Sequence, residues 1–558
     1  MAPFRSIYEK DATKKLVVGA ALLVLAAFYS YVFLLTLAPV YGSTPSHIFH
    51  GYGVGIAGVA GWFSKDIVDR VSGRKAIYAI PVLAFFLPVV QYFVSQQSSA
   101  LGNPAGPIFT EVLALYPLVL LSVACAGKLV QAGLNLQRHG DLVAEHIPLL
   151  GSYVIYSAGE HLIKAFLSRF IGSTVLLSRA GLQILIAIFY AAAVPSKALL
   201  LAIPAFLFSV TSNTHLPLGH TTTALNNIIA DDGFALVARQ DSTTGYISVL
   251  DNLEDGFRVM RCDHSLLGGQ WIKKRPNYTP PAVKDPIYAV FTMLEAVRLV
   301  ETAHGIPRAD AGSNALVIGL GIGTTPGALI SHGIDTTIVE IDPVVHKYAL
   351  QYFDLPENHT PIIEDARAFV QRSRNAPQPK QYDYIVHDVF TGGAEPVELF
   401  TYEFISGLHA LLKDDGVIAI NYAGDISLYS TALSIRTIKS IFPTCRLFRE
   451  AAAPEIGPDF TNMVIFCTKS RGAPITFRDP VPEDFLGSRF RSRYLVPKHE
   501  VDAAQFDNVG LEDGPQGHGR RVLVDKEVGR LHKYQDRSAL EHWGIMRTVL
   551  PDRVWEGW

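Results

Sequence analysis

The chain has 558 residues, of which 49% are hydrophobic and only 18% are charged, and its formal net charge is -3. Such a length exceeds one compact domain, and the apolar content is high for a soluble protein. Because lysines and arginines are scattered along the chain, nothing resembles an electrostatic footprint for nucleic acid, and we exclude nucleic acid as a partner.

Residues 1–210 are predicted to form a transmembrane helical domain. The run at 16–38 contains no charge and is long enough to cross the hydrocarbon core of about 30 Å as a helix. It is longer than a signal-peptide core and lacks a convincing small-residue cleavage site, so we do not interpret it as a removed leader. Further apolar runs lie at about 46–63, 76–95, 108–127, 147–163 and 174–194, with a short one at 198–210. We expect six spans, and a seventh only if the last, proline-broken run crosses the membrane.

The distribution of positive charge indicates an orientation. Lysines and arginines concentrate before the first span and between the second and third, whereas the loop at 96–107 has none. By the positive-inside rule the N-terminus is cytosolic. Six spans then return the chain to the cytosol, so we expect an integral, multi-pass membrane protein with a cytosolic domain after residue 210. The pattern does not identify which membrane.

Four ionisable residues fall inside the predicted spans, where such groups are costly and by default indicate a pathway or a ligand site: Glu111, Glu160, His161 and Arg179. Glu111 and Arg179 lie near span ends, and we interpret them as snorkelling toward water. For the adjacent pair Glu160 and His161, a functional site and a frayed helix end are both open.

The spacing of the cysteines predicts that the protein has no metal site. Cys125, Cys262, Cys445 and Cys467 are far apart and form neither a CxxC pair nor a metal-ligand spacing with histidine. We therefore expect four structural thiols in a reducing compartment.

After residue 210 the pattern changes from helical to β-rich and then to alternating helix and strand. Residues 235–252 and 256–265 alternate in polarity, which predicts a small antiparallel sheet within 211–300. Residues 301–475 are predicted to form an α/β Rossmann-like, S-adenosylmethionine-methyltransferase-like domain with a doubly wound, mostly parallel sheet. We place its strands at 315–319, 336–341, 361–364, 382–387, 416–421 and 463–468. Residues 476–558 are polar and lack a strong period, so we interpret them as a peripheral C-terminal tail.

The first predicted strand of this domain leads into a glycine-rich turn. Gly319, Gly321 and Gly323 let the backbone approach a ligand closely, and Glu340 ends the next strand, where an acid can hold both ribose hydroxyls of a nucleoside. The third glycine falls one position early for a GxGxxG fingerprint, with Thr324 at the expected place, and this disfavours NAD.

Two more acids follow the next two strands. Asp365 comes after the third strand and could meet an adenine amino group, and Asp388 ends the fourth strand. Acids at three successive strand ends are typical of an S-adenosylmethionine-type site. The alternative is a set of solvated loop acids in an ordinary α/β domain.

The motifs GLGIG, VEIDP, EDARAF and DVFTGGAEPVELFTYEF resemble, in order and spacing, the spermidine synthase (polyamine aminopropyltransferase) family, especially its members fused to membrane helices. The resemblance covers about 235–470, where HSLLGGQW and PIYAVF look like the family's N-terminal sheet and substrate gate. It implies that Glu340 binds ribose, that Asp365 binds adenine, and that Asp388 is the base that takes a proton from an attacking amine. It also implies that Gln270 and Tyr288 line the amine channel.

The same resemblance implies decarboxylated S-adenosylmethionine or S-adenosylmethionine as co-substrate, an amine as acceptor, the lipid bilayer as surroundings and a homodimer as one oligomeric state to consider. Three family carboxylates are missing. Their positions are Ile322 after the glycine pair, Thr391 three residues after the catalytic aspartate, and Val290 after the gate tyrosine. Thr391 would contact the substrate in place of an aspartate. Because charge-assisted hydrogen bonds to a diamine are lost, a short polyamine is disfavoured.

Three functions remain open on sequence alone. The first is a membrane-anchored transferase that moves an aminopropyl group to an amine. The second is an S-adenosylmethionine-dependent methyltransferase acting on a lipophilic or amine substrate. The third is a transporter or sensor whose α/β domain binds a nucleoside or polyamine as a regulatory ligand.

Overall fold

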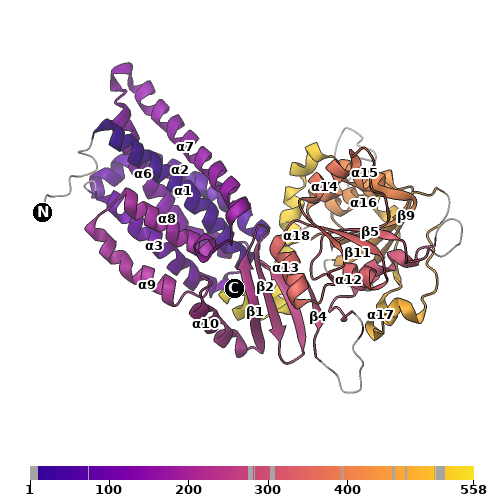
Figure 1. Cartoon of the computed structure of the whole chain (residues 1–558). Coiled ribbons are helices and arrows are strands. Elements are labelled where there is room, and N and C mark those ends of the chain that lie inside the picture. Colours follow the sequence, from indigo (N-terminus) through magenta and orange to yellow (C-terminus); the bar gives the residue numbers. More distant parts are fainter. Residues whose placement is uncertain are drawn as a thin grey trace. The chain divides into compact units, whose positions relative to one another are not determined.

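The computed structural model divides into two compact units, coloured along the sequence in Figure 1. The helical unit comprises residues 1–232, 239–245 and 547–558, and the α/β unit comprises residues 233–238 and 246–546. The structure describes residues 11–72, 75–273, 281, 283–301, 308–390, 393, 395–454, 459–471, 474–507, 509 and 522–558.

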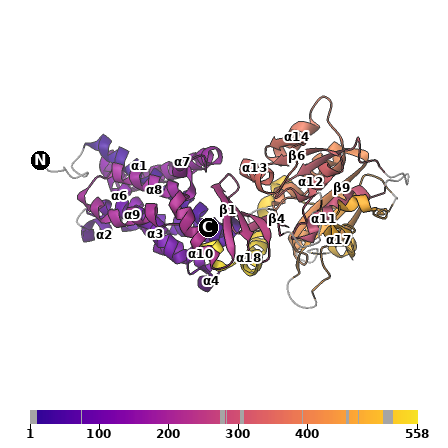
Figure 2. The ribbon, with the colours of Figure 1, turned by 60° about the horizontal axis from the view of Figure 1, so that its bottom comes forward.

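The helical unit is built around its first helix, α1 (Ala12–Tyr41). Its other helices are α2 (Ser43–Ser72), α3 (Ala76–Ser95), α4 (Ser98–Leu101), α5 (Ala105–Leu113), α6 (Leu115–Leu134), α7 (Asp141–Phe170), α8 (Arg179–Ala193), α9 (Ile203–Thr211), α10 (Gly219–Ala230) and α19 (Asp552–Gly557). Helix α1 contacts α2, α6, α7 and α8, and Figure 2 shows α6, α7 and α8 beside it. Its apolar residues therefore form the centre of this unit, and Leu22, Ala26 and Tyr29 are fully buried.

Three of the described helices are long and apolar enough to cross a membrane: α1, α3 and α6. Helices α2 and α7 have 30 residues each but are less apolar, and the runs at 174–194 and 198–210 form shorter apolar helices. The run at 108–127 is divided between α5 and α6. The structure thus supports three candidate spans, and the count of six remains a prediction.

The interpretation of Glu111 and Arg179 as snorkelling residues is wrong. Glu111 is 1% exposed, lies 2.5 Å from His50 Nδ1 through one carboxylate oxygen, and accepts a hydrogen bond of 2.6 Å from the Tyr116 hydroxyl through the other. Arg179 is 2% exposed, and its guanidinium lies 3.2 Å from a carboxylate oxygen of Asp241. Both charges have polar partners within the unit, so neither side chain needs to reach water.

The small sheet predicted after residue 210 is present. Its strands are β1 (Phe234–Asp241), β2 (Tyr246–Asn252), β3 (Phe257–Cys262) and β4 (Ser265–Trp271), in that spatial order, and β2–β3 and β3–β4 are antiparallel. Its apolar face, with Ile247 and Val249, packs in one core cluster with Leu320 and Ile322 of the glycine-rich turn. The sheet is therefore fixed against the site that the turn forms.

The second sheet has eight strands in the order β12-β10-β11-β9-β8-β5-β6-β7. These are β5 (Asn314–Ile318), β6 (Asp335–Glu340), β7 (Thr360–Ile363), β8 (Tyr382–His387), β9 (Leu412–Asp425), β10 (Thr444–Arg449), β11 (Phe460–Thr468) and β12 (His499–Val501). Strands β9, β8, β5, β6 and β7 are parallel, whereas β11 pairs antiparallel with β9 and β10. The predicted Rossmann-like, methyltransferase-like fold is thereby confirmed.

Helices cover this sheet on both faces, which is why its central strands are almost continuously apolar. The helices of the α/β unit that follow the small sheet in the chain are α11 (Ala289–Leu294), α12 (Thr324–Ser331), α13 (Pro343–Tyr352), α14 (Ala366–Arg374), α15 (Tyr402–Leu411), α16 (Tyr429–Ile441), α17 (Arg489–Tyr494) and α18 (His532–Val549). Buried residues of α14, α15 and α16 pack on one face of the sheet, and buried residues of α11 and α12 pack on the other. Neighbouring residues of β5 supply two different cores: Leu316 and Ile318 pack into one, and Ala315 and Val317 into the other. Strand order reverses at β5, between β6 and β8, and ligands of such sheets bind at this switch point beyond the carboxyl ends of the strands.

The expectation of four free thiols is wrong for two of the cysteines. Cys445 and Cys467 are directly opposite each other in the antiparallel pair β10–β11 and form a disulfide, whereas Cys125 and Cys262 are buried thiols outside that bond. The two bonded cysteines are 22 residues apart in sequence. Only the strand register brings them together, so spacing alone could not reveal the bond.

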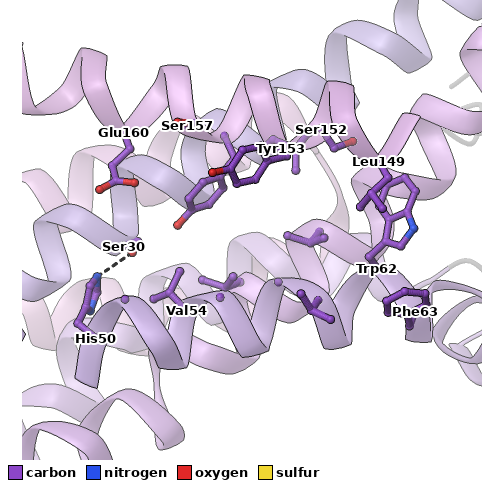
Figure 3. Close-up of a pocket in the computed structure, with 18 residues that line it drawn as sticks. Ser30, His50, Val54, Trp62, Phe63, Leu149, Ser152, Tyr153, Ser157 and Glu160 are labelled. Carbon is purple, nitrogen blue, oxygen red and sulfur yellow. Dashed lines mark hydrogen bonds between the residues drawn. The ribbon is translucent and has the colours of Figure 1, made fainter. Parts of the chain in front are cut away.

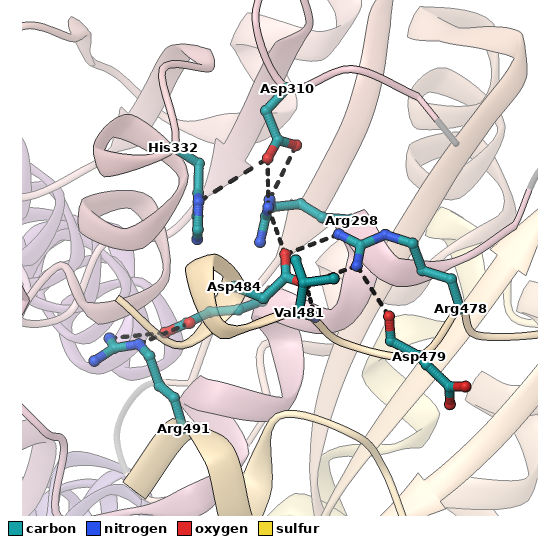
Figure 4. Close-up of polar contacts among 9 residues, drawn as sticks. Arg298, Asp310, His332, Arg478, Asp479, Val481, Asp484 and Arg491 are labelled. Carbon is teal, nitrogen blue, oxygen red and sulfur yellow. Dashed lines mark hydrogen bonds and ion pairs between the residues drawn. The ribbon is translucent and has the colours of Figure 1, made fainter. Parts of the chain in front are cut away.

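The segment 476–558, predicted as a peripheral tail, contributes helices and buried charge to the fold. Asp484 accepts hydrogen bonds from Arg298 (3.0 Å) and Arg478 (2.6 Å and 2.8 Å), and Arg491 donates two to Glu295 (2.9 Å and 3.0 Å), as Figure 4 shows in part. Arg298 and Glu295 belong to the 3-10 turn η5 (Glu295–Leu299) after α11. These ion pairs attach the segment to the α/β core. The last twelve residues instead belong to the helical unit.

Candidate active site

The glycine-rich turn connects β5 to α12, and its three glycine positions disfavour any side chain. Gly319, Gly321 and Gly323 have φ values of 85°, 54° and 87°, in the left-handed region that favours glycine. A Cβ at Gly319 would come within 2.1 Å of the backbone oxygen of Asp388, and one at Gly321 within 2.5 Å of the backbone oxygen of Leu267. The turn therefore lies tightly between the end of β8 and strand β4.

Glu340 is the last residue of β6 and is 8% exposed. One carboxylate oxygen accepts the backbone N–H of Leu320 (3.0 Å), and the other accepts that of Asp342 (2.8 Å). Burial raises the pKa of Glu340 to about 7, although these two N–H donors act in the opposite direction. The carboxylate is thus fixed beside the glycine turn, where a ribose diol can donate to its remaining lone pairs.

Asp365 lies one strand further along the same edge of the sheet. It follows β7, whose last residue Ile363 pairs with Glu340, and it begins α14 by accepting the N–H of Arg367 (2.8 Å). The side chain is exposed. One carboxylate oxygen of Asp365 caps the N-terminus of α14, which explains why an aspartate stands here. Because the side chain is exposed, its other carboxylate oxygen is accessible to a ligand.

Asp388 follows β8 at the switch point of the sheet. Its backbone N–H donates to Ile318 (2.9 Å), which continues the β5–β8 pairing, and its carboxylate accepts the side-chain amide of Asn421 in β9 (2.8 Å). The residue is half-buried, and loss of water around the carboxylate raises its pKa to about 6, against the lowering effect of Asn421. Near neutral pH Asp388 is therefore mostly an anion that can accept a proton.

Gln270 and Tyr288 reach this region through β4. The backbone segment before Tyr288 pairs with β4: Ile287 donates to Gly269 (2.9 Å), and Pro286 bridges to Gln270. Gln270 is buried, with its amide 3.5 Å from Asp354, and Tyr288 is half-buried, with its pKa raised to about 12 by burial. Strand β4, which carries Gln270, lies against the glycine turn, because a Cβ at Gly268 would come within 3.0 Å of Ile322.

Two of the three departures from the family pattern are buried apolar side chains. Ile322 is 4% exposed in the cluster shared with the small sheet, and Val290 of α11 is 2% exposed in the core on which that helix packs. A carboxylate at either position would be in an apolar environment, so neither position can anchor a substrate ammonium. Thr391, the third position, lies outside the described residues.

Helix α18 places a residue beside the Asp388 loop that the sequence analysis missed. The ring of His542 lies 5.0 Å from that of Phe390 and 5.9 Å from that of Phe460, and its Nε2 is 3.2 Å from the Ser265 hydroxyl. His542 is buried, and burial lowers its pKa to about 4, so the ring is neutral. No sequence motif indicated it, because α18 lies in the segment interpreted as a tail.

Glu395 and Glu450 are two further carboxylates near this edge that no motif indicated. Glu395 is 5% exposed, one of its oxygens has no hydrogen-bond partner among the described residues, and burial raises its pKa to about 8. Glu450, after β10, accepts the backbone N–H groups of Ala289 (2.7 Å) and Val290 (3.1 Å) next to Tyr288. Asn421 was also missed, although a polar residue at the end of a predicted strand is a signal that could have found it.

The comparisons with known proteins concern this same part of the chain. Residues 301–475 match the Spermine/spermidine synthase domain family. The resemblance drawn from the sequence motifs is thereby confirmed.

Relatives with curated descriptions are similar over short stretches only. The chain is 36% identical over 131 residues to "Polyamine aminopropyltransferase" of Vibrio vulnificus (strain CMCP6), covering 23% of this chain and 42% of the relative. It is 30% identical over 124 residues to "Probable polyamine aminopropyl transferase" of Bifidobacterium longum (strain NCC 2705), covering 22% and 27%. The chain thus spans less than half the length of these relatives. Among solved structures, a probable spermidine synthase from Corynebacterium glutamicum is 15% identical, with a TM-score of 0.39, over 52% of this chain and 96% of that one.

Proposed function

We propose that the α/β unit transfers an aminopropyl group from decarboxylated S-adenosylmethionine to an amine, and that the helical unit anchors the enzyme in a membrane. The single observation that carries the proposal is the position of Asp388. Asp388 follows β8 at the switch point of the sheet, its backbone oxygen lies against Gly319 of the glycine turn, and its half-buried carboxylate accepts a hydrogen bond from Asn421. The match to the synthase domain and the names of the relatives support the same reaction class.

The residues present fit a nucleoside co-substrate. Glu340 would accept the two ribose hydroxyls, the closely packed glycines would let the nucleoside lie against backbone, and Asp365 would accept the adenine amino group. Gln270 and Tyr288 would line the path of the acceptor amine, with Thr391 in the place of the usual second aspartate. The buried Ile322 and Val290 leave these positions without a carboxylate for a second ammonium, which favours an acceptor with one amine near the reacting carbon.

Asp388 would supply the base. An ammonium group has no free electron pair, so its proton must leave as the nitrogen attacks. The nitrogen forms a bond to the propyl carbon next to the sulfonium, the carbon–sulfur bond breaks with its electrons passing to sulfur, and the proton goes to Asp388. The products are the aminopropylated amine and methylthioadenosine. With a pKa of about 6, the carboxylate of Asp388 is ionised at neutral pH. This pKa is also near the operating pH, where general base catalysis is most efficient.

Calorimetric binding by the full-length protein in lipid nanodiscs tests the proposal first. The full chain is needed because residues 547–558 belong to the helical unit. Decarboxylated S-adenosylmethionine, S-adenosylmethionine and methylthioadenosine are compared, and Glu340→Ala is the control that should lose binding of all three. Preference for the decarboxylated form supports the proposal, preference for the intact form points to methyl transfer, and binding of neither overturns both enzyme functions.

Product analysis with Asp388→Asn separates the reactions further. Aminopropyl transfer releases methylthioadenosine, whereas methyl transfer releases S-adenosylhomocysteine. We expect Asp388→Asn to abolish methylthioadenosine release while leaving co-substrate binding intact. If transport of an amine across vesicles persists in this variant while no product forms in the wild type, the transporter or sensor hypothesis replaces the enzyme.

A further inference from the structure

The helical unit contains a cavity of about 380 Å³, a volume within the range of small-molecule sites. Helices α1, α2, α6 and α7 line it, so it is separate from the Asp388 site. Figure 3 shows its two ends: Ser30, His50 and Glu160 lie at one, and Trp62 and Phe63 lie at the other. Along α2 the distance from His50 to Phe63 is roughly 20 Å at 1.5 Å per residue. The cavity is therefore long and narrow.

Between its ends the α2 wall of the cavity is apolar, and missing side chains on α2 create its depth, whereas α7 adds Ser152, Tyr153, Tyr156 and Ser157 to the lining. Gly51, Gly55 and Gly58 line it, and a Cβ built on any of them would meet nothing within 4 Å. Leu23 of α1 and Leu149 of α7 contribute to the remaining walls. A hydrocarbon chain is the kind of ligand that such a wall accommodates, because it offers no hydrogen-bonding groups that the wall would leave unpaired.

The polar end is a hydrogen-bonded relay that reaches the cavity surface. Tyr116 donates to Glu111 (2.6 Å), Glu111 lies 2.5 Å from His50 Nδ1, and His50 Nε2 lies 3.0 Å from the Ser30 hydroxyl. Ser30, His50 and Glu111 are all buried. With Nδ1 donating to Glu111, the imidazole presents the Nε2 lone pair toward Ser30.

Charge at this end is unbalanced. Glu160 lines the cavity and pairs with Lys164 at 2.5 Å, so that carboxylate has a cationic partner. Among the described residues, the polar partners of Glu111 are the imidazole of His50 and the phenol of Tyr116. The carboxylates of Glu111 and Glu160 thus outnumber the one lysine of this group, Lys164, in an environment where uncompensated charge is expensive.

We propose that this cavity binds a long-chain primary amine, with its hydrocarbon chain along the glycine face of α2 and its ammonium group at the Ser30, His50 and Glu160 end. The ammonium offers three donors, and this end offers two kinds of acceptor: the oxygen of the Ser30 hydroxyl, whose proton points to His50 Nε2, and the carboxylate of Glu160. Its positive charge also compensates the excess carboxylate. The proposal concerns binding alone and stands whether or not the α/β unit transfers an aminopropyl group.

Quenching of Trp62 fluorescence in the full-length protein in nanodiscs tests this site. The probe is dodecylamine brominated at its chain end, which would bring the quencher to the Trp62 end of the cavity. We expect saturable quenching that is absent in Trp62→Phe. The matched alcohol, dodecanol with the same bromination, should bind at least about tenfold more weakly, because the charge-assisted hydrogen bonds are lost.

A pair of glycine variants separates this cavity from the surrounding lipid. Gly55→Leu fills the apolar wall and should weaken amine binding at least about tenfold, since its side chain would occupy the space of the chain. Gly151→Leu on α7 is the matched control: that glycine also has nothing within 4 Å of its Cβ position, and it does not line the cavity. Equal binding of amine and alcohol by the wild type, or unchanged amine binding in Gly55→Leu, would overturn the proposal.

Discussion

Replacing Asn421 by alanine tests whether Asp388 is a base whose strength its neighbour sets. The Asn421 amide donates to the Asp388 carboxylate at 2.8 Å and lowers its pKa, which burial otherwise raises to about 6. A hydrogen bond to a charged group contributes about 1.5–3 kcal/mol, and one pKa unit corresponds to about 1.4 kcal/mol. Asn421→Ala should therefore raise the pKa of Asp388 by about one to two units.

The sign of the pH effect follows from the role of Asp388. A general base acts in its deprotonated form, so activity is lost as pH falls through its pKa, and a higher pKa moves this loss to higher pH. At pH 7 the variant should be about two to ten times slower than the wild type, and near pH 9 the difference should largely disappear.

The assay is methylthioadenosine release from decarboxylated S-adenosylmethionine between about pH 5 and 9, with a mixture of polyamines and long-chain amines as acceptors. Asn314→Ala is the control, because Asn314 is the first residue of β5, at the opposite end of that strand from the glycine turn. A rate that drops equally at every pH, with its acidic limb unmoved, would refute the reasoning and show that Asn421 acts only on geometry.

Three further predictions concern burial, ion pairing and backbone conformation. Burial raises the pKa of Glu395 from 4.5 to about 8, so the folded wild type should lose stability as pH rises from 4.5 to about 8. Glu395→Gln should remove this loss, and urea denaturation at several pH values measures it. Asp484→Asn should cost about 1.5–3 kcal/mol of unfolding free energy, because the buried Arg298, which keeps Asp310, and the half-buried Arg478 both lose an ion-pair partner. The exposed Asp479→Asn should change the unfolding free energy by less than about 0.5 kcal/mol. Gly319→Ala should abolish nucleoside binding in calorimetry, since its Cβ would come within 2.1 Å of backbone oxygen, whereas Gly312→Ala, with a similar φ of 88° but open space, should retain it.

Local sequence patterns predicted the elements that present the candidate site. Apolar runs followed by an acid predicted that Glu340 ends β6 and that Asp365 and Asp388 follow β7 and β8, and the glycines predicted the turn after β5. Such patterns are readable because a buried parallel strand must be apolar on both faces, and its carboxyl end is where a polar side chain first becomes useful. The alternating segment before them likewise predicted the small antiparallel sheet.

Contacts between distant segments were decided by the tertiary structure alone. Asn421 reaches Asp388 because β9 pairs with β8, Cys445 meets Cys467 through strand register, and His542 reaches the Asp388 loop from α18. In the helical unit, Glu111 meets the imidazole of His50 across two helices. The sequence determined which residues end strands and which runs are apolar, because those properties depend on neighbours in the chain. Partners, burial and the pKa values that follow from them depend on packing between segments, and only the folded chain sets them.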